Sequence, residues 1–459
     1  EQNPEDWWRA LIDTVRRAVA QAAIDPGAIS GIGFSGQMHG VVCLDETLRP
    51  LRPAIIWADT RSAPQVAALE ARLSRNDIAR YAPGRPAAGW MGPSLMWLAE
   101  HEPETLARTQ QIIMPKDYVR LRMTGQAAAE ISDAGSTWLL DIKSGQWSGW
   151  LVEQCGLEMR YLPPLLRSEQ FAGELLPAAA AELGLPAGIA VAAGCADQPA
   201  QALGYGLVEP GIDLVTIGTG GQVFHPLAQP AVDPNLRLHT YPHAAPGRWY
   251  AQAAILAGGL SLRWLRDVLG LAQREDAYTH LSALAAPVAL GADGLLFLPY
   301  LAGERTPHMD PQASGAFLGL RLHHTTGHLA RAVMEGVALA MADCLERVAA
   351  LTEGASHSAI IITGGASNSA VWRQIQADVY ARSVSLATGE HQACVGAALL
   401  AGVASGAFTS VTEAAGRIPG PAEVIEPDPQ RSAFYRERLA LHREMYPLLH
   451  GAMHRLAAR

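Results

Sequence analysis

The sequence predicts an α/β protein of more than one domain. Strand-like apolar runs alternate with helical patterns along the chain, and several runs end in glycines or in a single acid, as strands of α/β sheets do. At 459 residues the chain is too long for one hydrophobic core, which predicts two or three domains. Glycine and strand patterns recur from Gly211 onward. We therefore expect two domains, residues 1–208 and 209–459, with the boundary near 208–211.

The first half of the chain begins with an amphipathic helical pattern over residues 4–22. Because few domains begin with a core helix and no preceding strand, we expect sequence to be missing upstream of Glu1. The elements that follow are predicted as strands over residues 29–34, 41–44 and 111–114, a strand beginning at 54, and helices over 64–73 and 93–100. Residues 130–140 are rich in small polar side chains, which predicts a loop.

The stretch over residues 187–224 carries the strongest sign of a site. A buried strand over 189–193 ends in a loop that carries one acid, Asp197. A short helix leads to a second strand over 212–217, the turn Gly218-Thr219-Gly220-Gly221 and a returning strand, the pattern of a hairpin. Asp197 followed by Pro199 is also a plain helix start, with about even odds on its own. An acid close to a turn whose N–H groups suit phosphate favours phosphoryl transfer.

A second glycine-rich turn lies in the C-terminal half. A β-branched strand over 359–363 runs into Gly364-Gly365-Ala366-Ser367-Asn368 and then a helix over 370–381, which brings a nucleotide close to the backbone. No Walker A sequence and no G-x-G-x-x-G after a strand occur. Further elements are predicted as a strand over 295–300, a helix over 327–349 and a small-residue helix over 394–402, either an interdomain hinge or a tightly packed helix.

Composition excludes several classes of protein. The net charge of −9 and the absence of a basic block argue against nucleic acid as a principal partner. The apolar runs are too short to span a bilayer, and no signal peptide opens the chain. Five widely spaced cysteines without a C-x-x-C pair predict a reducing, cytoplasmic location. His323, His324 and His328 lack metal-ligand spacing, so we expect no metal site formed by protein side chains.

Two further clusters of side chains follow predicted strands of the first half. Met38 and His39 come after the strand over 29–34; on residue type alone they are better explained as a core methionine and a satisfied histidine. Asp59 and Arg61 follow the next strand, where they form either a surface ion pair or part of a ligand site.

Several motifs together resemble the FGGY family of carbohydrate kinases. They are Gly36-Gln37-Met38-His39-Gly40, Trp57-Ala58-Asp59-Thr60-Arg61, Met114-Pro115-Lys116-Asp117-Tyr118, Gly303-Glu304-Arg305-Thr306-Pro307-His308 and Gly364-Gly365-Ala366. The pattern Gly315-x-Phe317-x-Gly319-Leu320, seven residues, His328-Leu329 and Ala332-Val333-Met334-Glu335 also matches the family. The resemblance runs from the first helix to about Gly402. It implies a two-domain, actin-like ATPase (ribonuclease H-like) fold with a cleft between the domains.

The resemblance also implies an activity and the residues that carry it. Within the family, the sequence resembles the kinases that phosphorylate D-xylulose to D-xylulose 5-phosphate with ATP and Mg²⁺. Asp197 resembles the general base that takes the proton from the sugar hydroxyl. Residues 1–208 then bind the sugar through Gln37, Met38, His39, Trp57, Asp59 and Gln198. Residues 209–459 then bind ATP through Gly218, Thr219, Gly220, Gly364, Gly365, Ala366 and Asn368.

The sequence departs from the family in three places. The first phosphate hairpin, a strand with Asp-x-Gly-Thr, is not found ahead of the helix over 4–22. Ala196-Asp197-Gln198 stands where Gly-Asp-Asn is common, and Ser94 follows Pro93 where lysine is expected. The rival interpretations are a kinase for another ketose or polyol and a non-catalytic sugar or nucleotide sensor. We expect sugar and ATP as partners and neither nucleic acid nor membrane, with a homodimer as the candidate assembly.

Overall fold

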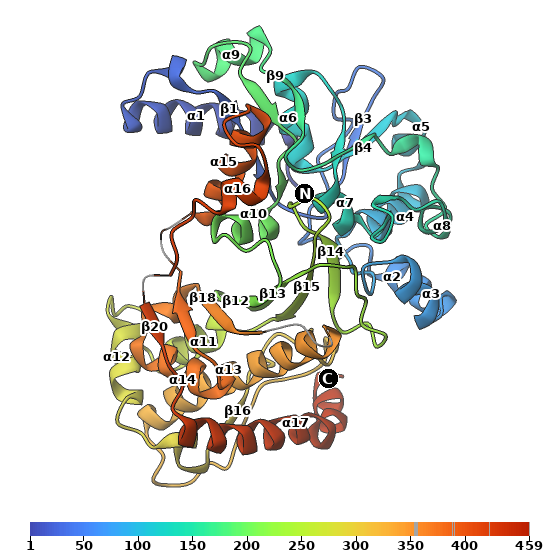
Figure 1. Ribbon diagram of the computed structural model, residues 1–459. Coiled ribbons are helices and arrows are strands. Elements are labelled where there is room, and N and C mark those ends of the chain that lie inside the picture. The colour runs from blue at the N-terminus through green and yellow to red at the C-terminus, as the bar shows by residue number, and fades with distance from the viewer. Residues whose placement is uncertain (353–356, 388, 390, 422, 459) are drawn as a thin grey trace. The chain divides into compact units, whose positions relative to one another are not determined.

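The computed structural model describes residues 1–352, 357–387, 389, 391–421 and 423–458, and divides them into two compact units (Figure 1). The first unit comprises Glu1–Glu209, Leu227–Tyr250 and Gly389–Pro419. The second comprises Pro210–Pro226, Ala251–Thr388 and Gly420–Arg459. The first passage of the chain between them lies in the region where the sequence places a domain boundary. The chain later returns to the first unit twice, over Leu227–Tyr250 and Gly389–Pro419, and the division predicted from the sequence contains neither return.

The first unit consists of short strands surrounded by helices. Its strands are β1 (Gly31–Ile32), β2 (Ser35–Gly36), β3 (Val42–Leu44), β4 (Gln111–Ile113), β5 (Ala129–Glu130), β6 (Leu140–Asp141), β7 (Gln146–Trp147), β8 (Leu165–Leu166), β9 (Phe171–Glu174), β10 (Ala190–Ala192), β11 (Cys195–Ala196) and β14 (His239–Pro242). Its helices are α1 (Pro4–Ala22), α2 (Ala63–Arg72), α3 (Arg75–Tyr81), α4 (Met91–His101), α5 (Pro103–Arg108), α6 (Pro115–Thr124), α7 (Ile131–Ala134), α8 (Gly149–Gln154), α9 (Pro177–Leu183), α10 (Asp197–Gly204), α15 (Gln392–Ala404) and α16 (Val411–Ala415).

Helix α15 packs against α10 more closely than side chains would allow. A Cβ atom on Gly396 would lie 1.9 Å from the carbonyl oxygen of Ala200, so only glycine fits at this crossing. Leu400 of α15 and Leu203 of α10 then share one buried apolar cluster. The small residues of the predicted helix over 394–402 therefore serve tight packing within the first unit.

The second unit is built on a sheet in which strands run in the order β15-β13-β12-β18-β19-β20. Strands β12 and β13 are antiparallel, whereas β12, β18 and β19 are mutually parallel neighbours. The strands are β12 (Ile212–Ile217), β13 (Gly221–Leu227), β15 (Trp249–Ile255), β16 (Leu296–Leu298), β17 (Ala316–Leu318), β18 (Ala359–Thr363), β19 (Val384–Leu386) and β20 (Glu423–Ile425). The helices are α11 (Gly259–Val268), α12 (Ala277–Ala285), α13 (Thr326–Leu351), α14 (Ala370–Tyr380) and α17 (Pro429–Ala457). Helices α13, α14 and α17 pack against one another (Figure 1).

Comparison with the predicted elements shows where local pattern sufficed. The predicted helix over 4–22 and the strands over 212–217 and 359–363 have the bounds of α1, β12 and β18. The strand expected from residue 54 is wrong, since Ala54 and Ile55 form only isolated bridges. The loop expected over 130–140 is also wrong in part, because Glu130 accepts hydrogen bonds from the first N–H groups of α7 and so starts a helix there.

Among the residues that the structure describes, no helix combines the length and the apolar composition that crossing a bilayer requires.

Candidate active site

Two parallel strands place the predicted base beside the predicted sugar contacts in the first unit. Strand β11 pairs with β2 so that Cys195 faces Ser35 and Ala196 faces Gly36. Asp197 and Gln37 directly follow these pairs, so the chain leaves both strands at the same edge. This edge, at the carboxyl ends of parallel strands, is where α/β proteins commonly bind ligands.

Asp197 lies at the first position of α10 rather than at its N-cap. The N-cap is Ala196, and no side-chain hydrogen bond caps the helix. The interpretation of Asp197 as the capping residue is therefore wrong. Its Oδ1 is buried and has no hydrogen-bond partner among the described groups. Burial raises the pKa of Asp197 from 3.8 to about 6, although hydrogen bonds from Gln198 lower it in part. A carboxylate with this pKa is ionised at neutral pH and is a stronger base than an exposed aspartate.

His39 is held in one orientation by two neighbouring segments. Its backbone N–H donates to Oγ of Ser136 over 3.2 Å, and Nδ1 donates to the carbonyl oxygen of Ser136 over 2.7 Å. The ring stacks on Trp90 with centroids 4.7 Å apart and an interplanar angle of 7°. Met38 beside it is buried. The imidazole is thus both satisfied and positioned next to the strand edge that carries Asp197.

The other predicted sugar residues lie around the same segments. Trp57 is 56 % exposed, and Asp59 forms an ion pair with Arg61 over 2.8 Å. The backbone carbonyl oxygens of Trp57 and Asp59 lie close to Gly89. A Cβ atom on Gly89 would lie 2.4 Å from the carbonyl oxygen of Trp57. The loop therefore packs directly against the residue before Trp90. Gln37 donates to Oε1 of Gln2 over 3.0 Å.

A buried group of charges lies next to this site, and sequence reasoning missed it. Lys116 is surrounded by three carboxylates, with Nζ 2.7 Å from Asp117 Oδ1, 3.8 Å from Glu130 Oε2 and 3.8 Å from Asp133 Oδ2. All four side chains are at most 1 % exposed. Lys116 and Asp117 belong to one of the motifs that resemble the family. For Glu130 and Asp133, the only sign in the sequence was an acidic residue at each end of the segment Glu130-Ile131-Ser132-Asp133.

In the second unit, a cavity of about 680 Å³ collects most of the predicted nucleotide residues. Because Thr216 of β12 pairs with Thr363 of β18, the turn after each strand leaves the sheet at the same place. Of the predicted residues, Gly218, Thr219, Gly365, Ala366 and Asn368 line the cavity. The remaining two predicted residues, Gly220 and Gly364, do not line it.

Gly364 has a conformational role beside the cavity. Its φ is +86°, and a Cβ atom would lie 2.5 Å from the carbonyl oxygen of Ile217 and 3.1 Å from the amide nitrogen of Gly218. Only glycine adopts this conformation without strain and lets the two turns approach each other. The close approach brings both turns to the same wall of the cavity.

Helices α11 and α12 supply the side of the cavity that sequence reasoning missed. Arg263 comes from α11, and Tyr278, Thr279 and Ser282 come from α12. Ser282 Oγ donates to Oγ of Ser369 over 3.0 Å. Apolar walls combined with a few hydroxyl groups and one guanidinium are typical of sites for a nucleoside with phosphates.

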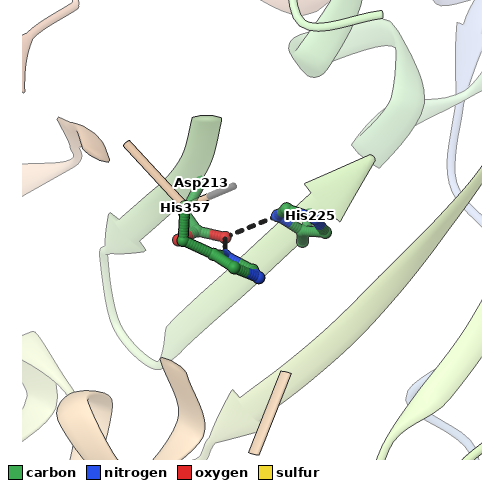
Figure 2. Close-up of side chains that lie close together, drawn as sticks. All are labelled: Asp213, His225 and His357. Carbon is green, nitrogen blue, oxygen red and sulfur yellow. Dashed lines mark hydrogen bonds and ion pairs between the residues drawn. The ribbon is translucent and has the colours of Figure 1, made fainter. Parts of the chain in front are cut away.

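A separate cluster in the second unit contains metal-ligand types. Asp213, His225 and His357 place one ligand atom each within 4.8 Å of the others. Figure 2 shows both histidine side chains next to the carboxylate of Asp213. However, Nδ1 of His225 and Nδ1 of His357 already donate to the carboxylate of Asp213, over 2.7 Å and 3.2 Å. Arg382 donates to the same carboxylate over 2.5 Å. A cation would have to displace this guanidinium. We therefore interpret the cluster as a set of polar contacts that connects strands β12 and β13 with the residues just before β18 and β19.

Comparison with known proteins gives one family for both parts of the chain. Residues 1–204 match the N-terminal domain of the FGGY family of carbohydrate kinases, and residues 214–405 match its C-terminal domain. The xylulose kinase of Escherichia coli is 36 % identical over 98 % of this chain and 90 % of its own. That of Bacillus subtilis is 35 % identical over 97 % of this chain and 88 % of its own. The gluconokinase of Bacillus subtilis is 30 % identical over 89 % and 80 %.

The solved structure of xylulose kinase from Rhodospirillum rubrum has the same fold, with a TM-score of 0.88, 31 % identity, and coverage of 99 % of this chain and 91 % of that one. The chain belongs to the FGGY family of carbohydrate kinases. It is thus a sugar kinase, a transferase of a family that uses ATP, with the two-domain actin-like ATPase fold expected from the sequence.

Proposed function

We propose that this sugar kinase phosphorylates D-xylulose to D-xylulose 5-phosphate with Mg-ATP. The similarity to xylulose kinases over nearly the whole chain supports this substrate. The observation that carries the proposal is the pairing of β11 with β2, which sets Asp197 beside the Gln37-Met38-His39 segment. A base and a set of sugar contacts at one strand edge are what phosphorylation of a sugar hydroxyl requires.

In the proposed reaction Asp197 acts as the general base. Its carboxylate takes the proton of the sugar hydroxyl as that oxygen forms a bond to the γ-phosphorus of ATP. The bond between the γ-phosphorus and the bridging oxygen breaks, and ADP leaves. A magnesium ion bound to the phosphates of ATP would supply neutralisation of their charge. The sugar is held by the side chains predicted from the resemblance: Gln37, Met38, His39, Trp57, Asp59 and Gln198.

The nucleotide part of the proposal rests on the cavity of the second unit. Its volume of about 680 Å³ suits a molecule of the size of ATP. The turns Gly218-Thr219-Gly220 and Gly364-Gly365-Ala366 would offer backbone N–H groups to phosphate oxygens, and Asn368 would contact the adenosine. The five cysteines are free, which fits the reducing cytoplasm in which a sugar kinase acts.

A kinase for a different sugar is the second candidate. The relative named gluconokinase supports it, as does Gln198, whose side chain is longer than the asparagine common in the family. The longer amide would extend into the space beside Asp197 and alter which hydroxyl groups fit.

The test is ADP release in the presence of Mg-ATP, measured with D-xylulose, ribulose, glycerol and gluconate. It is run on this chain and on a protein extended upstream of Glu1. Turnover that depends on xylulose and exceeds turnover with the other three supports the proposal. Preference for another sugar replaces the substrate, and the absence of turnover in both proteins with all four contradicts it.

A further inference from the structure

Asp133 differs from the two other carboxylates around Lys116. Asp117 is bound by two cations, Lys116 at 2.7 Å and Arg120 at 2.9 Å. Glu130 accepts hydrogen bonds from the N–H groups of Ser132 and Asp133 and from the hydroxyl groups of Ser132 and Ser168. Neither Oδ1 nor Oδ2 of Asp133 has a hydrogen-bond partner among the described groups, although the side chain is fully buried.

A buried carboxyl group without hydrogen bonds is unfavourable and requires an explanation. The contact with Lys116, at 3.8 Å, is an ion pair without a hydrogen bond. Neither oxygen of Asp133 therefore uses its hydrogen-bonding capacity within the described residues. The neighbouring Glu130 shows that the same segment can satisfy a buried carboxylate completely, so the difference between the two acids is specific to Asp133.

The segment that carries Asp133 forms hydrogen bonds with the strand that leads to Asp197 and with His39. One residue earlier, Ser132 Oγ accepts a hydrogen bond from the N–H of Ala196 over 3.1 Å, immediately before Asp197. Three residues later, Ser136 binds the backbone and the ring of His39. Helix α7 also packs against β11, the strand that ends at Asp197. Along the chain, Asp133 thus lies between Ser132, which is bonded to the residue before Asp197, and Ser136, which is bonded to His39.

We propose that Asp133 is a sugar-binding residue, whose carboxyl group forms hydrogen bonds with a hydroxyl group of the substrate other than the one phosphorylated. The inference rests on the proposed function, because it assigns a further residue to the same sugar site. A hydroxyl group both donates and accepts, and so does a protonated carboxyl group. Lys116 contacts the carboxyl group as an ion pair over 3.8 Å and forms no hydrogen bond with its oxygens.

The electrostatics of the site agree with this assignment. Burial raises the pKa of Asp133 well above its ordinary value; the charge of Lys116 opposes the rise, and the charges of Asp117, Glu130 and Asp197 add to it. The raised pKa favours the neutral form of Asp133, which does not repel the ionised Asp197. Two acids in one site then have separate tasks, one as base and one as hydrogen-bonding partner, as their different environments favour.

The test compares three variants by steady-state kinetics, with thermal unfolding to verify folding. Asp133→Leu, close in size and without polar atoms, should raise the sugar KM about 10- to 100-fold, leave the KM for ATP within about twofold and lower kcat less. Asp133→Asn, which still donates and accepts, should raise the sugar KM less than about tenfold. Asp233→Asn is the control: this buried acid of the same unit bonds Asn235 and Arg237 of its own loop, so it should affect stability and not KM.

A cycle with deoxy sugars identifies the contact and remains informative if Asp133→Leu does not fold. In the wild type, removing the contacted hydroxyl from D-xylulose, as the 1-, 3- or 4-deoxy analogue, should weaken binding at least about tenfold. In Asp133→Asn, removing the same hydroxyl group should weaken sugar binding several-fold less than in the wild type. The other deoxy analogues should bind both proteins with the same relative loss. Equal losses for every analogue in both proteins, or a KM unchanged by both Asp133 substitutions, would overturn the inference.

Failure of the proposed function gives a different result. If the wild type does not phosphorylate xylulose but accepts ribulose, glycerol or gluconate, the substrate is wrong, and the cycle is repeated with deoxy analogues of the accepted sugar. Coupling to Asp133 there would support the sugar contact. Turnover of xylulose without any coupling would refute the contact alone, and absence of turnover with all four sugars would contradict both.

Discussion

Replacing Asp197 with asparagine should change activity and stability in opposite directions. Removal of a general base typically lowers kcat ~10²- to 10⁴-fold. Stability should rise, because the wild-type protein holds an ionised carboxylate in a buried position where its pKa is about 6 instead of 3.8. Each tenfold change in proton affinity corresponds to about 1.4 kcal/mol, so ionisation at pH 7 costs about 3 kcal/mol of folding free energy. The neutral amide of the Asp197→Asn variant would not carry this cost.

The difference in stability between the wild type and Asp197→Asn should depend on pH. The unfolded chain releases the proton of Asp197 near pH 4 and the folded protein releases it near pH 6. The wild type therefore loses stability relative to Asp197→Asn as pH rises from about 4 to 6, and the difference is constant above that range. The same ionisation should make wild-type kcat fall below pH 6, as one proton is taken up.

Two assays check this prediction. ADP release with saturating sugar and ATP measures turnover, and urea unfolding at pH 4.5 and pH 7.5 measures the free energy of unfolding. A more stable variant at pH 7.5, a smaller difference at pH 4.5 and a large loss of kcat agree with the reasoning. Activity near that of the wild type would refute the role as base. Lower stability at pH 7.5 would refute the argument from burial.

Three further substitutions test the remaining features. Gly364→Ala should raise the KM for ATP at least about fivefold, because its Cβ would meet the carbonyl oxygen of Ile217 at positive φ; an unchanged KM would show that the turn does not shape the nucleotide site. Asp213→Asn should lower the free energy of unfolding by about 3–5 kcal/mol at pH 7. Burial alone would raise the pKa of Asp213, but hydrogen bonds from two histidines and the charge of an arginine hold it below its usual value, so the stabilisation is full above about pH 4 and is lost in stronger acid; parallel urea midpoints of both proteins down to pH 3 would contradict this. Trp90→Ala should raise the sugar KM about 2- to 10-fold through loss of the stack on His39, with the KM for ATP as the internal control.

Local sequence pattern was sufficient wherever one segment determines its own structure. The strand over 212–217 and its glycine turn were predictable because β-branched residues and a glycine cluster define a hairpin without help from the rest of the chain. The same holds for the helix over 4–22. The glycine turn at Gly364 was also predictable, since the strand before it and the helix after it were both visible in the sequence, but its close approach to the carbonyl oxygen of Ile217 was not.

The residues that sequence reasoning missed depend on contacts between distant segments. Helix α7 forms because Glu130 caps it and Ser168, 38 residues away, fastens Glu130. Nothing in the local sequence distinguishes that acid from Asp133, whose oxygens stay unbonded. Similarly, Ser282 and Tyr278 line the cavity of the second unit only because α12 packs beside the turn that follows β18. Side-chain pairing of this kind is a property of the tertiary structure.

The glycine contact between α15 and α10 also bears on the order in which the protein can fold during synthesis. The helix that begins at Asp197 rests on residues 392–404, which leave the ribosome almost two hundred residues later. Until then, the apolar face formed by Ala200 and Leu203 has no partner from α15. A fragment ending at Glu209 would lack this support, so it should behave as an incomplete folding unit that is prone to aggregation.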